Sequence, residues 1–170
     1  MKISLKLCLA VVALAFFGAA IGMFGLSFLD QETASVLGGA KHSWANGFEI
    51  AFNKDNILED GKNLGTLFAF ILVALGAAAA LCAVALSFAN GGKKSKKGNS
   101  TAKLICAASI FVICAVVPAV LLFLTKQTTG LALDAKTILG STETTLGVGA
   151  ILAAIFSLLG GCSLAVAELK

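Results

Sequence analysis

Residues 64–89 read LGTLFAFILVALGAAAALCAVALSFA, an apolar stretch that contains no Asp, Glu, Lys or Arg. At a rise of about 1.5 Å per residue, a helix of this length spans the ~30 Å hydrocarbon core of a lipid bilayer. Three further stretches share this character: residues 7–29, 104–125 and 146–167. We therefore predict an all-α membrane protein whose fold is a four-helix transmembrane bundle.

The overall composition fits the same class. Of the 170 residues, 58% are hydrophobic and only 13% are charged, about half of the ~25% typical of soluble domains. Four spans leave room for a single membrane domain, residues 1–170, with no separate soluble domain. All 13 basic residues are Lys and Tyr is absent, which excludes an arginine fork for phosphate groups and a phenol as catalyst.

The five cysteines all fall within the apolar stretches, so we expect them to pack as small soft side chains. None lies in the two long loops, where an oxidising compartment would place disulfides. Metal binding would need clustered thiolates with imidazole or carboxylate partners, and we expect no metal and no cofactor. The cysteines are Cys8, Cys82, Cys106, Cys114 and Cys162.

The first apolar stretch leaves two interpretations open. The basic residues 1–6, the apolar core and Gly18-Ala19-Ala20 together resemble a cleavable signal peptide. However, the apolar stretch continues to Leu29 without a polar break, which favours an uncleaved first helix.

The distribution of Lys predicts the topology. The two termini and the loop 90–103 carry eight Lys and one acid, whereas the loops 30–63 and 126–145 carry five Lys and eight acids. By the positive-inside rule, both termini and the loop 90–103 are cytoplasmic and the other two loops are exoplasmic. Lys without Arg suggests an AT-rich genome, so we expect a multi-pass protein of a bacterial cell membrane.

A cluster of four basic residues in the cytoplasmic loop invites a nucleic-acid interpretation. The cluster lies directly between two spans and has no interleaved aromatic residue. We therefore interpret it as a topology determinant that touches anionic lipid headgroups, and we expect no nucleic-acid partner. Its members are Lys93, Lys94, Lys96 and Lys97.

Two helix faces carry small residues at helical spacing, which allows close approach of a neighbouring backbone in a membrane. Internal packing of the bundle is the expected use, and oligomerisation is the alternative. The face on the fourth stretch is Gly149, Ala153, Ser157, Gly161 and Ala165, and that on the first is Ala15, Gly18, Gly22 and Gly25. Pro118 should kink the third span.

The loop 30–63 is the expected interaction site. In residues 47–52, the alternation of Phe48, Ile50 and Phe52 is typical of a half-buried strand, and Gly47 precedes it. Trp44 lies just upstream and would either cover that strand or anchor in the membrane interface. With residues 131–133 as a further strand, we predict a small exoplasmic β-sheet cap.

The same loop holds the only candidates for metal or acid–base chemistry. These are His42, Glu49, Asp55, Glu59 and Asp60. Residues 53–61 lack the alternating acids and central Gly of a calcium-binding loop, so we interpret them as a solvated turn.

The chain resembles small four-span membrane proteins of low-GC bacteria. The resemblance covers the hydropathy and loop order of the whole chain, and at residue level it rests on Trp44-Ala45-Asn46-Gly47-Phe48 and on the Leu-Gly pairs at 64–65 and 146–147. The layout is also similar to the claudin group, but the first loop lacks that group's cysteine pair. This resemblance implies the topology and a capping sheet, and no functional residue.

These patterns favour a structural or accessory membrane protein over an enzyme. It would interact with membrane lipids and with a protein partner, or with itself as a homo-oligomer, through the bundle faces and the first exoplasmic loop. A small transporter or channel subunit is the alternative, although no acid lies at membrane depth, where such proteins usually place one.

Overall fold

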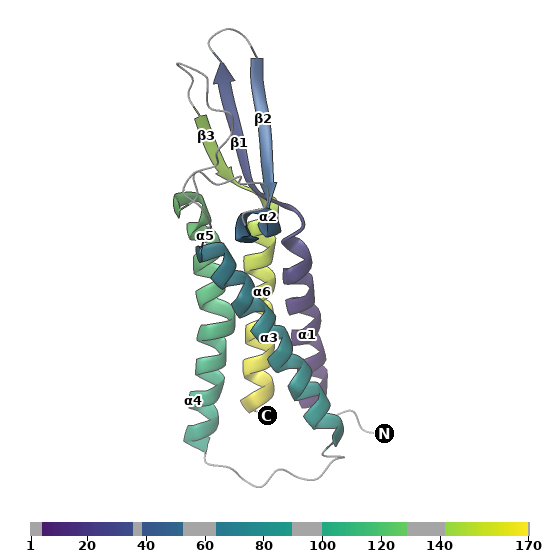
Figure 1. Cartoon of the computed structure of the whole chain (residues 1–170). Coiled ribbons are helices and arrows are strands. Elements are labelled where there is room, and N and C mark those ends of the chain that lie inside the picture. The colour runs from purple at the N-terminus through teal and green to yellow at the C-terminus, as the bar shows by residue number, and fades with distance from the viewer. Residues whose placement is uncertain (1–4, 36–38, 53–63, 90–99, 129–141, 170) are drawn as a thin grey trace.

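The computed structural model describes residues 5–35, 39–52, 64–89, 100–128 and 142–169. Within these ranges, four long helical segments lie side by side and a small sheet projects from one end of them (Figure 1). All four segments are long and apolar enough to cross a membrane. The predicted fold class, a helical bundle of four spans with a small sheet at one end, is confirmed.

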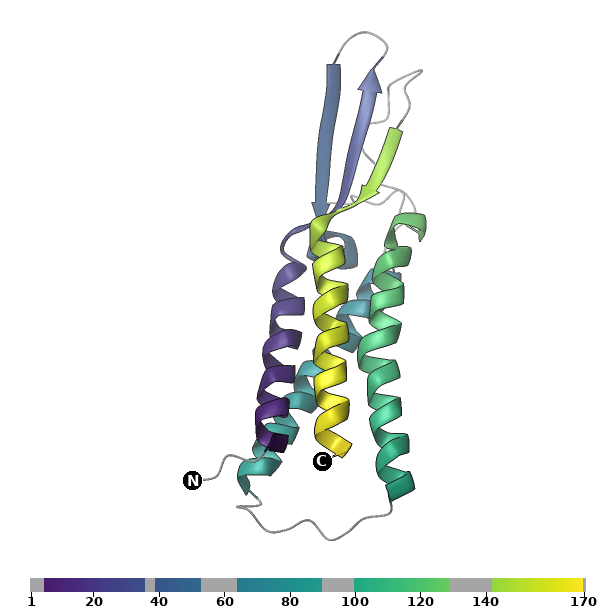
Figure 2. The same ribbon diagram turned by 180° about the vertical axis from the view of Figure 1, so that it is seen from behind.

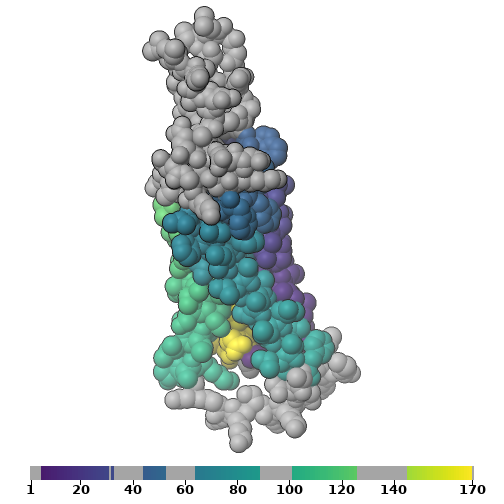
Figure 3. Space-filling model, viewed as in Figure 1, coloured from purple at the N-terminus to yellow at the C-terminus, as the bar shows by residue number. Residues whose placement is uncertain are grey.

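The bundle is organised around its last helix, α6 (Val148–Leu169). Half of the most apolar stretch of α6 is buried, against 22–28% for the other three spans. In Figure 2 it lies between α1 and the run of α4 and α5, and in Figure 3 only its C-terminal end is visible between α3 and α4. The surrounding elements are α1 (Leu5–Met23), α3 (Leu64–Ala89), and the continuous run α4 (Ser100–Phe111), η2 (Val112–Val116) and α5 (Val117–Thr128).

The sheet has three antiparallel strands in the order β2-β1-β3. They are β1 (Ser27–Ser35), β2 (Gly39–Asn46) and β3 (Thr142–Leu146). Since β1 follows α1 and β3 precedes α6, the sheet continues the two helices that have the most extensive mutual contact. It stands at the end of the bundle opposite to the start of α1 and the end of α6 (Figure 1).

The two span boundaries next to the sheet lie inside the predicted apolar stretches. The first helix ends at Met23, and residues 27–29 belong to β1. A turn separates the two elements, in which Phe24 and Leu26 donate backbone hydrogen bonds three residues back, at 3.1 and 3.0 Å. The last helix likewise begins at Val148, and Leu146 is the end of β3. Phe28 and Leu29 are buried inside the protein at the base of the sheet. Hydropathy cannot distinguish an apolar residue that is buried in this way from one that faces lipid.

The strand predicted over residues 47–52 is wrong, because this segment is the short helix α2 (Gly47–Phe52). A reciprocal cap starts it: the Glu49 backbone N–H donates to Asn46 Oδ1 at 2.8 Å, and the Asn46 N–H donates to the Glu49 carboxylate at 3.0 Å. In a helix, Phe48 and Phe52 share one face, and both rings contact Phe70 of α3. The other predicted strand, residues 131–133, lies outside the described residues.

The cap of α2 leads to a first prediction. Asn46→Ala removes the acceptor for the Glu49 N–H, and we expect it to lower the free energy of unfolding by about 1 kcal/mol. Glu32→Ala, an exposed acid of β1, is the control and should leave stability unchanged. Thermal unfolding in detergent, followed by circular dichroism, measures both, and equal stability of the two variants would contradict the role of the cap.

The helical run of the third span widens just before Pro118. Residues 112–116 form a π-helical turn, and the Val117 N–H donates to Val112 O, five residues back. Pro118 has no N–H and its ring clashes with the carbonyl four residues earlier in a regular helix. The wider turn accommodates that mismatch, and it brings the buried Ala115 against α6.

Candidate functional site

Small residues of α6 lie at the centre of the bundle. All five members of its predicted face, Gly149, Ala153, Ser157, Gly161 and Ala165, are buried. A Cβ added at Gly149 would lie 2.7 Å from Ser27 O, and one at Gly161 would collide with the Cβ of Ala115. The Ser157 hydroxyl donates to Ala154 O at 2.9 Å, so its polarity is satisfied within the helix.

The small-residue face of α1 points away from the bundle, so the expected internal packing of this face is wrong. Ala15, Gly18 and Gly22 of α1 are exposed, as is Gly25 in the turn that follows the helix. A Cβ added at Gly18 or Gly22 would meet nothing within 4 Å. α1 turns another face to the bundle, which carries Ala10, Ala13, Phe17 and Ala20. Both faces of this helix contain small residues, and the face that packs inside the bundle is the one that also carries the Phe17 ring.

The buried face of α1 is built around Phe17, which is fully buried. Its ring lies against two glycines on different helices: a Cβ added at Gly76 of α3 would lie 2.6 Å from Phe17 Cε1, and one at Gly160 of α6 would lie 3.1 Å from Phe17 Cδ2. The absence of side chains at these two positions creates the space for the ring. Phe17 therefore joins three of the four spans.

A cluster of aromatic rings lies at the base of the sheet, and most residues of the predicted interaction loop pack in it. The Phe24 ring lies 4.7 Å from that of Phe28 and 5.2 Å from that of Phe70, centroid to centroid. Gly47 is buried against these rings, because a Cβ there would lie 2.8 Å from Phe24. Ile50 is also buried, and Phe48 and Phe52 pack on Phe70. These residues hold the sheet to the bundle.

Trp44 is the most exposed member of that loop, with 62% of its area exposed against 53% for Phe52. It lines a hollow of about 420 Å³ where α1, the sheet and α6 meet. We name this feature the junction hollow; its lining residues are Gly25, Leu26, Ser27, Asp30, Trp44 and Val148. A smaller hollow of about 320 Å³ lies beside α2 and is lined by Asn46, Phe48, Glu49 and Phe52.

A β-bulge shapes the junction hollow. The register of β1 against β2 shifts between Ser27 and Leu29, so that Phe28 is the extra residue. Residues three apart in a regular strand point to opposite faces, but the bulge brings Ser27 and Asp30 together, and Ser27 Oγ donates to Asp30 Oδ1 at 2.6 Å. Asp30 pairs directly with Trp44 across the strands, which places the carboxylate and the indole on the same face.

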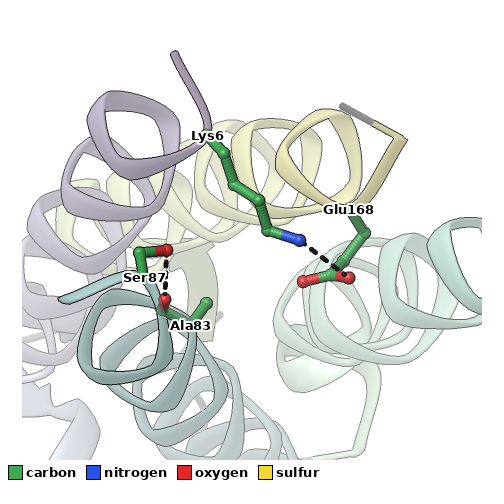
Figure 4. A network of polar contacts seen from close by, with 4 residues as sticks. All are labelled: Lys6, Ala83, Ser87 and Glu168. Carbon is green, nitrogen blue, oxygen red and sulfur yellow. Dashed lines mark hydrogen bonds and ion pairs between the residues drawn. The ribbon is translucent and has the colours of Figure 1, made fainter. Parts of the chain in front are cut away.

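The described lining of the junction hollow carries one negative charge. Among the described residues that line it, Asp30 is the only charged one. In the part of the chain that the structure describes, the one ion pair joins Lys6 to Glu168 at 3.5 Å, at the opposite end of the bundle (Figures 1 and 4). The rest of the lining is apolar or neutral, including Leu26 and Val148, which are 45% and 63% exposed. The hollow is therefore suited to a group that is cationic at one point and apolar elsewhere.

Sequence reasoning identified Trp44 but missed Asp30, Leu26, Ser27 and Val148. The hydropathy pattern places Leu26 and Ser27 in the first span and Val148 in the fourth, and it marks Asp30 only as the start of the loop. The one available signal was that Asp30 is the first acid after the first apolar stretch.

Most of the remaining predicted site residues cannot be placed among the described ranges. Lys93, Lys94, Lys96 and Lys97 lie outside the described residues, as do Asp55, Glu59 and Asp60. The backbone of His42 is in β2, opposite Glu32. Among the described residues no group of three His, Cys, Asp or Glu side chains could hold a metal ion.

Apart from the Lys6–Glu168 pair at the ends of α1 and α6, the side-chain contacts described within the spans involve hydroxyl groups. Thr66 of α3 and Thr125 of α5 are both fully buried, and their hydroxyl oxygens lie 3.2 Å apart. The Ser87 hydroxyl donates to Ala83 O at 2.7 Å, a contact that Figure 4 also draws. These contacts join helices or return to the backbone, and they form no acid–base constellation.

Comparisons with protein families, with curated proteins and with solved structures find no match for this chain. Its function is therefore inferred from its own residues: an outward small-residue face on α1, a junction hollow with one carboxylate and one indole, and spans whose buried polar groups are hydroxyls.

Proposed function

We propose that this protein is a non-catalytic, structural or accessory membrane protein that packs a transmembrane helix of another polypeptide against the outward face of α1. The observation that carries the proposal is the position of Gly18 and Gly22, whose added Cβ atoms would meet nothing within 4 Å. Lipid chains gain little from a bare glycine surface, whereas a second helix can approach it closely and gain van der Waals contact and Cα–H···O bonds.

Membrane placement follows from the four apolar spans. The Lys-rich side, which includes both termini, is cytoplasmic in this proposal, and the sheet is exoplasmic. The described spans support an accessory role over a transporter or channel subunit, because the polar side chains buried in them are Thr66, Thr125 and Ser157. Transport pathways usually contain ionisable groups at this depth.

Site-specific photocrosslinking in native membranes tests the proposal. A photoreactive residue at Ala15, on the outward face of α1, should give one adduct of defined mass, and the same residue at Phe68, an exposed position of α3, should not. An adduct of twice the mass of the chain identifies a second copy as the occupant, and any other mass identifies a different partner.

A glycine variant makes this test specific to the face. Gly22→Leu fills the space that a docked helix needs, so we expect it to remove the adduct formed from Ala15 while the protein stays folded. Crosslinks of equal yield from Ala15 and Phe68, or an adduct that survives Gly22→Leu, would overturn the proposal.

A further inference from the structure

We propose that the junction hollow binds the ammonium group of a phospholipid headgroup of the ethanolamine class. The inference rests on the proposed membrane placement of the four spans, but not on the docking of a helix on α1. α1 ends at Met23 and α6 begins at Val148, and the sheet starts at this level of the bundle (Figure 2). Leu26 and Val148 line the hollow, so it lies where the apolar helices end and the sheet begins. In a bilayer this is the depth of the headgroups.

The lining of the hollow matches an ammonium ion. A carboxylate accepts charge-assisted hydrogen bonds from a primary ammonium, and an indole face attracts a cation through its quadrupole. Asp30 and Trp44 are paired across β1 and β2 on one face. The Ser27 hydroxyl occupies Oδ1 of Asp30 and fixes the carboxylate, which leaves Oδ2 as the acceptor for a ligand.

The apolar part of the lining distinguishes a lipid from a soluble cation. Leu26 follows α1 and Val148 begins α6, and these two lining residues are 45% and 63% exposed. A soluble cation gains nothing from these side chains. A phospholipid whose ammonium sits at Asp30 would bring its glycerol and upper acyl carbons to the level of Leu26 and Val148.

The intrinsic fluorescence of the protein reports this site, because Trp44 is the only Trp in the chain. The full chain in detergent is titrated with short-chain phosphatidylethanolamine and, separately, with phosphatidylglycerol of the same acyl length. The two lipids share the phosphate and the chains and differ in the ammonium. We expect a shift of the Trp44 emission with both, and about tenfold tighter binding of phosphatidylethanolamine.

Variants test the role of the carboxylate. Asp30→Asn should remove the preference for phosphatidylethanolamine, whereas Glu32→Gln, an exposed acid of the same strand that does not line the hollow, should keep it. Trp44→Phe retains an aromatic face and Trp44→Ala does not; native mass spectrometry should find phosphatidylethanolamine retained on the first and lost from the second. The comparison of the two lipids on the unaltered protein does not depend on how any variant folds.

Other occupants would give different results. Equal affinity for the two lipids, or a preference that survives Asp30→Asn, would overturn the proposal. Free phosphoethanolamine or Ca²⁺ that shifted the emission as strongly as the lipid would show a site for soluble cations and would also overturn it. Gly22→Leu should not change the lipid preference, so the failure of helix docking on α1 and the failure of lipid binding can be told apart.

Discussion

Phe17→Ala is expected to lower the free energy of unfolding by about 3 kcal/mol, the lower end of the range for Phe→Ala in protein cores. The ring is fully buried and fills the space left by Gly76 and Gly160. In detergent or lipid the unfolded chain is also in apolar surroundings, so most of the cost comes from lost van der Waals contacts and from the cavity. Three of the four spans lose their common contact.

Phe68→Ala is the matched control, since it removes the same ring from an exposed position of α3, 55% accessible. We expect a change in the free energy of unfolding of less than about 0.5 kcal/mol. Titration of the detergent-solubilised protein with sodium dodecyl sulfate, followed by circular dichroism, measures both variants. If Phe17→Ala were no more destabilising than Phe68→Ala, Phe17 would not be the contact that joins α1, α3 and α6.

The number and approximate position of the spans could be predicted from the sequence because the bilayer imposes a length. An uncharged stretch as long as residues 64–89 has few other structural uses, and α3 covers that range from end to end. The end of the first span could not be predicted in this way. Phe24, Phe28 and Leu29 are as apolar as lipid-facing residues, but they are buried in the turn and strand beneath the sheet.

The same ambiguity explains the error over α2. Residues that alternate as Phe48, Ile50 and Phe52 do suit a strand, and the pattern is too short to separate a period of two from one of 3.6. The decisive signal was the pair Asn46 and Glu49, which form a capping box and favour a helix start. The structure has the predicted sheet at this end of the bundle, but more polar segments form it: β1 and β2, which precede α2, and β3, which precedes α6.

The junction hollow depends on features that a single sequence does not display. The sequence singles out Trp44 by its place just upstream of residues 47–52, but Asp30 becomes its neighbour only through the pairing of β1 with β2. Ser27 reaches Asp30 only through the bulge at Phe28. Likewise, both faces of α1 contain small residues, and only the packing of Phe17 decides which one turns outward.

Gly161→Leu and Gly18→Leu make the same chemical change on the two small-residue faces and should have opposite results. At Gly161 the new Cβ would collide with Ala115, whose Cα and N lie 3.2 and 3.3 Å away. These are backbone atoms of the π-helical turn, so the side chain cannot escape by rotation and the helices must separate. We expect a loss of about 3 kcal/mol of unfolding free energy or more, at the upper end of overpacking effects.

Gly18→Leu should leave the isolated protein as stable as before or slightly more so, because nothing lies within 4 Å of the new Cβ and Leu has the higher helix propensity by about 0.8 kcal/mol. The same titration with dodecyl sulfate measures both variants. The effect of Gly18→Leu should appear instead in the crosslinking from Ala15, because a Leu at position 18 blocks the approach of a partner helix. A stable Gly18→Leu protein that has lost its adduct would show that the face at Gly161 packs inside the bundle, whereas the face at Gly18 contacts a partner. Equal destabilisation by the two substitutions would show that the face at Gly18 is covered within the chain and would contradict its role in docking.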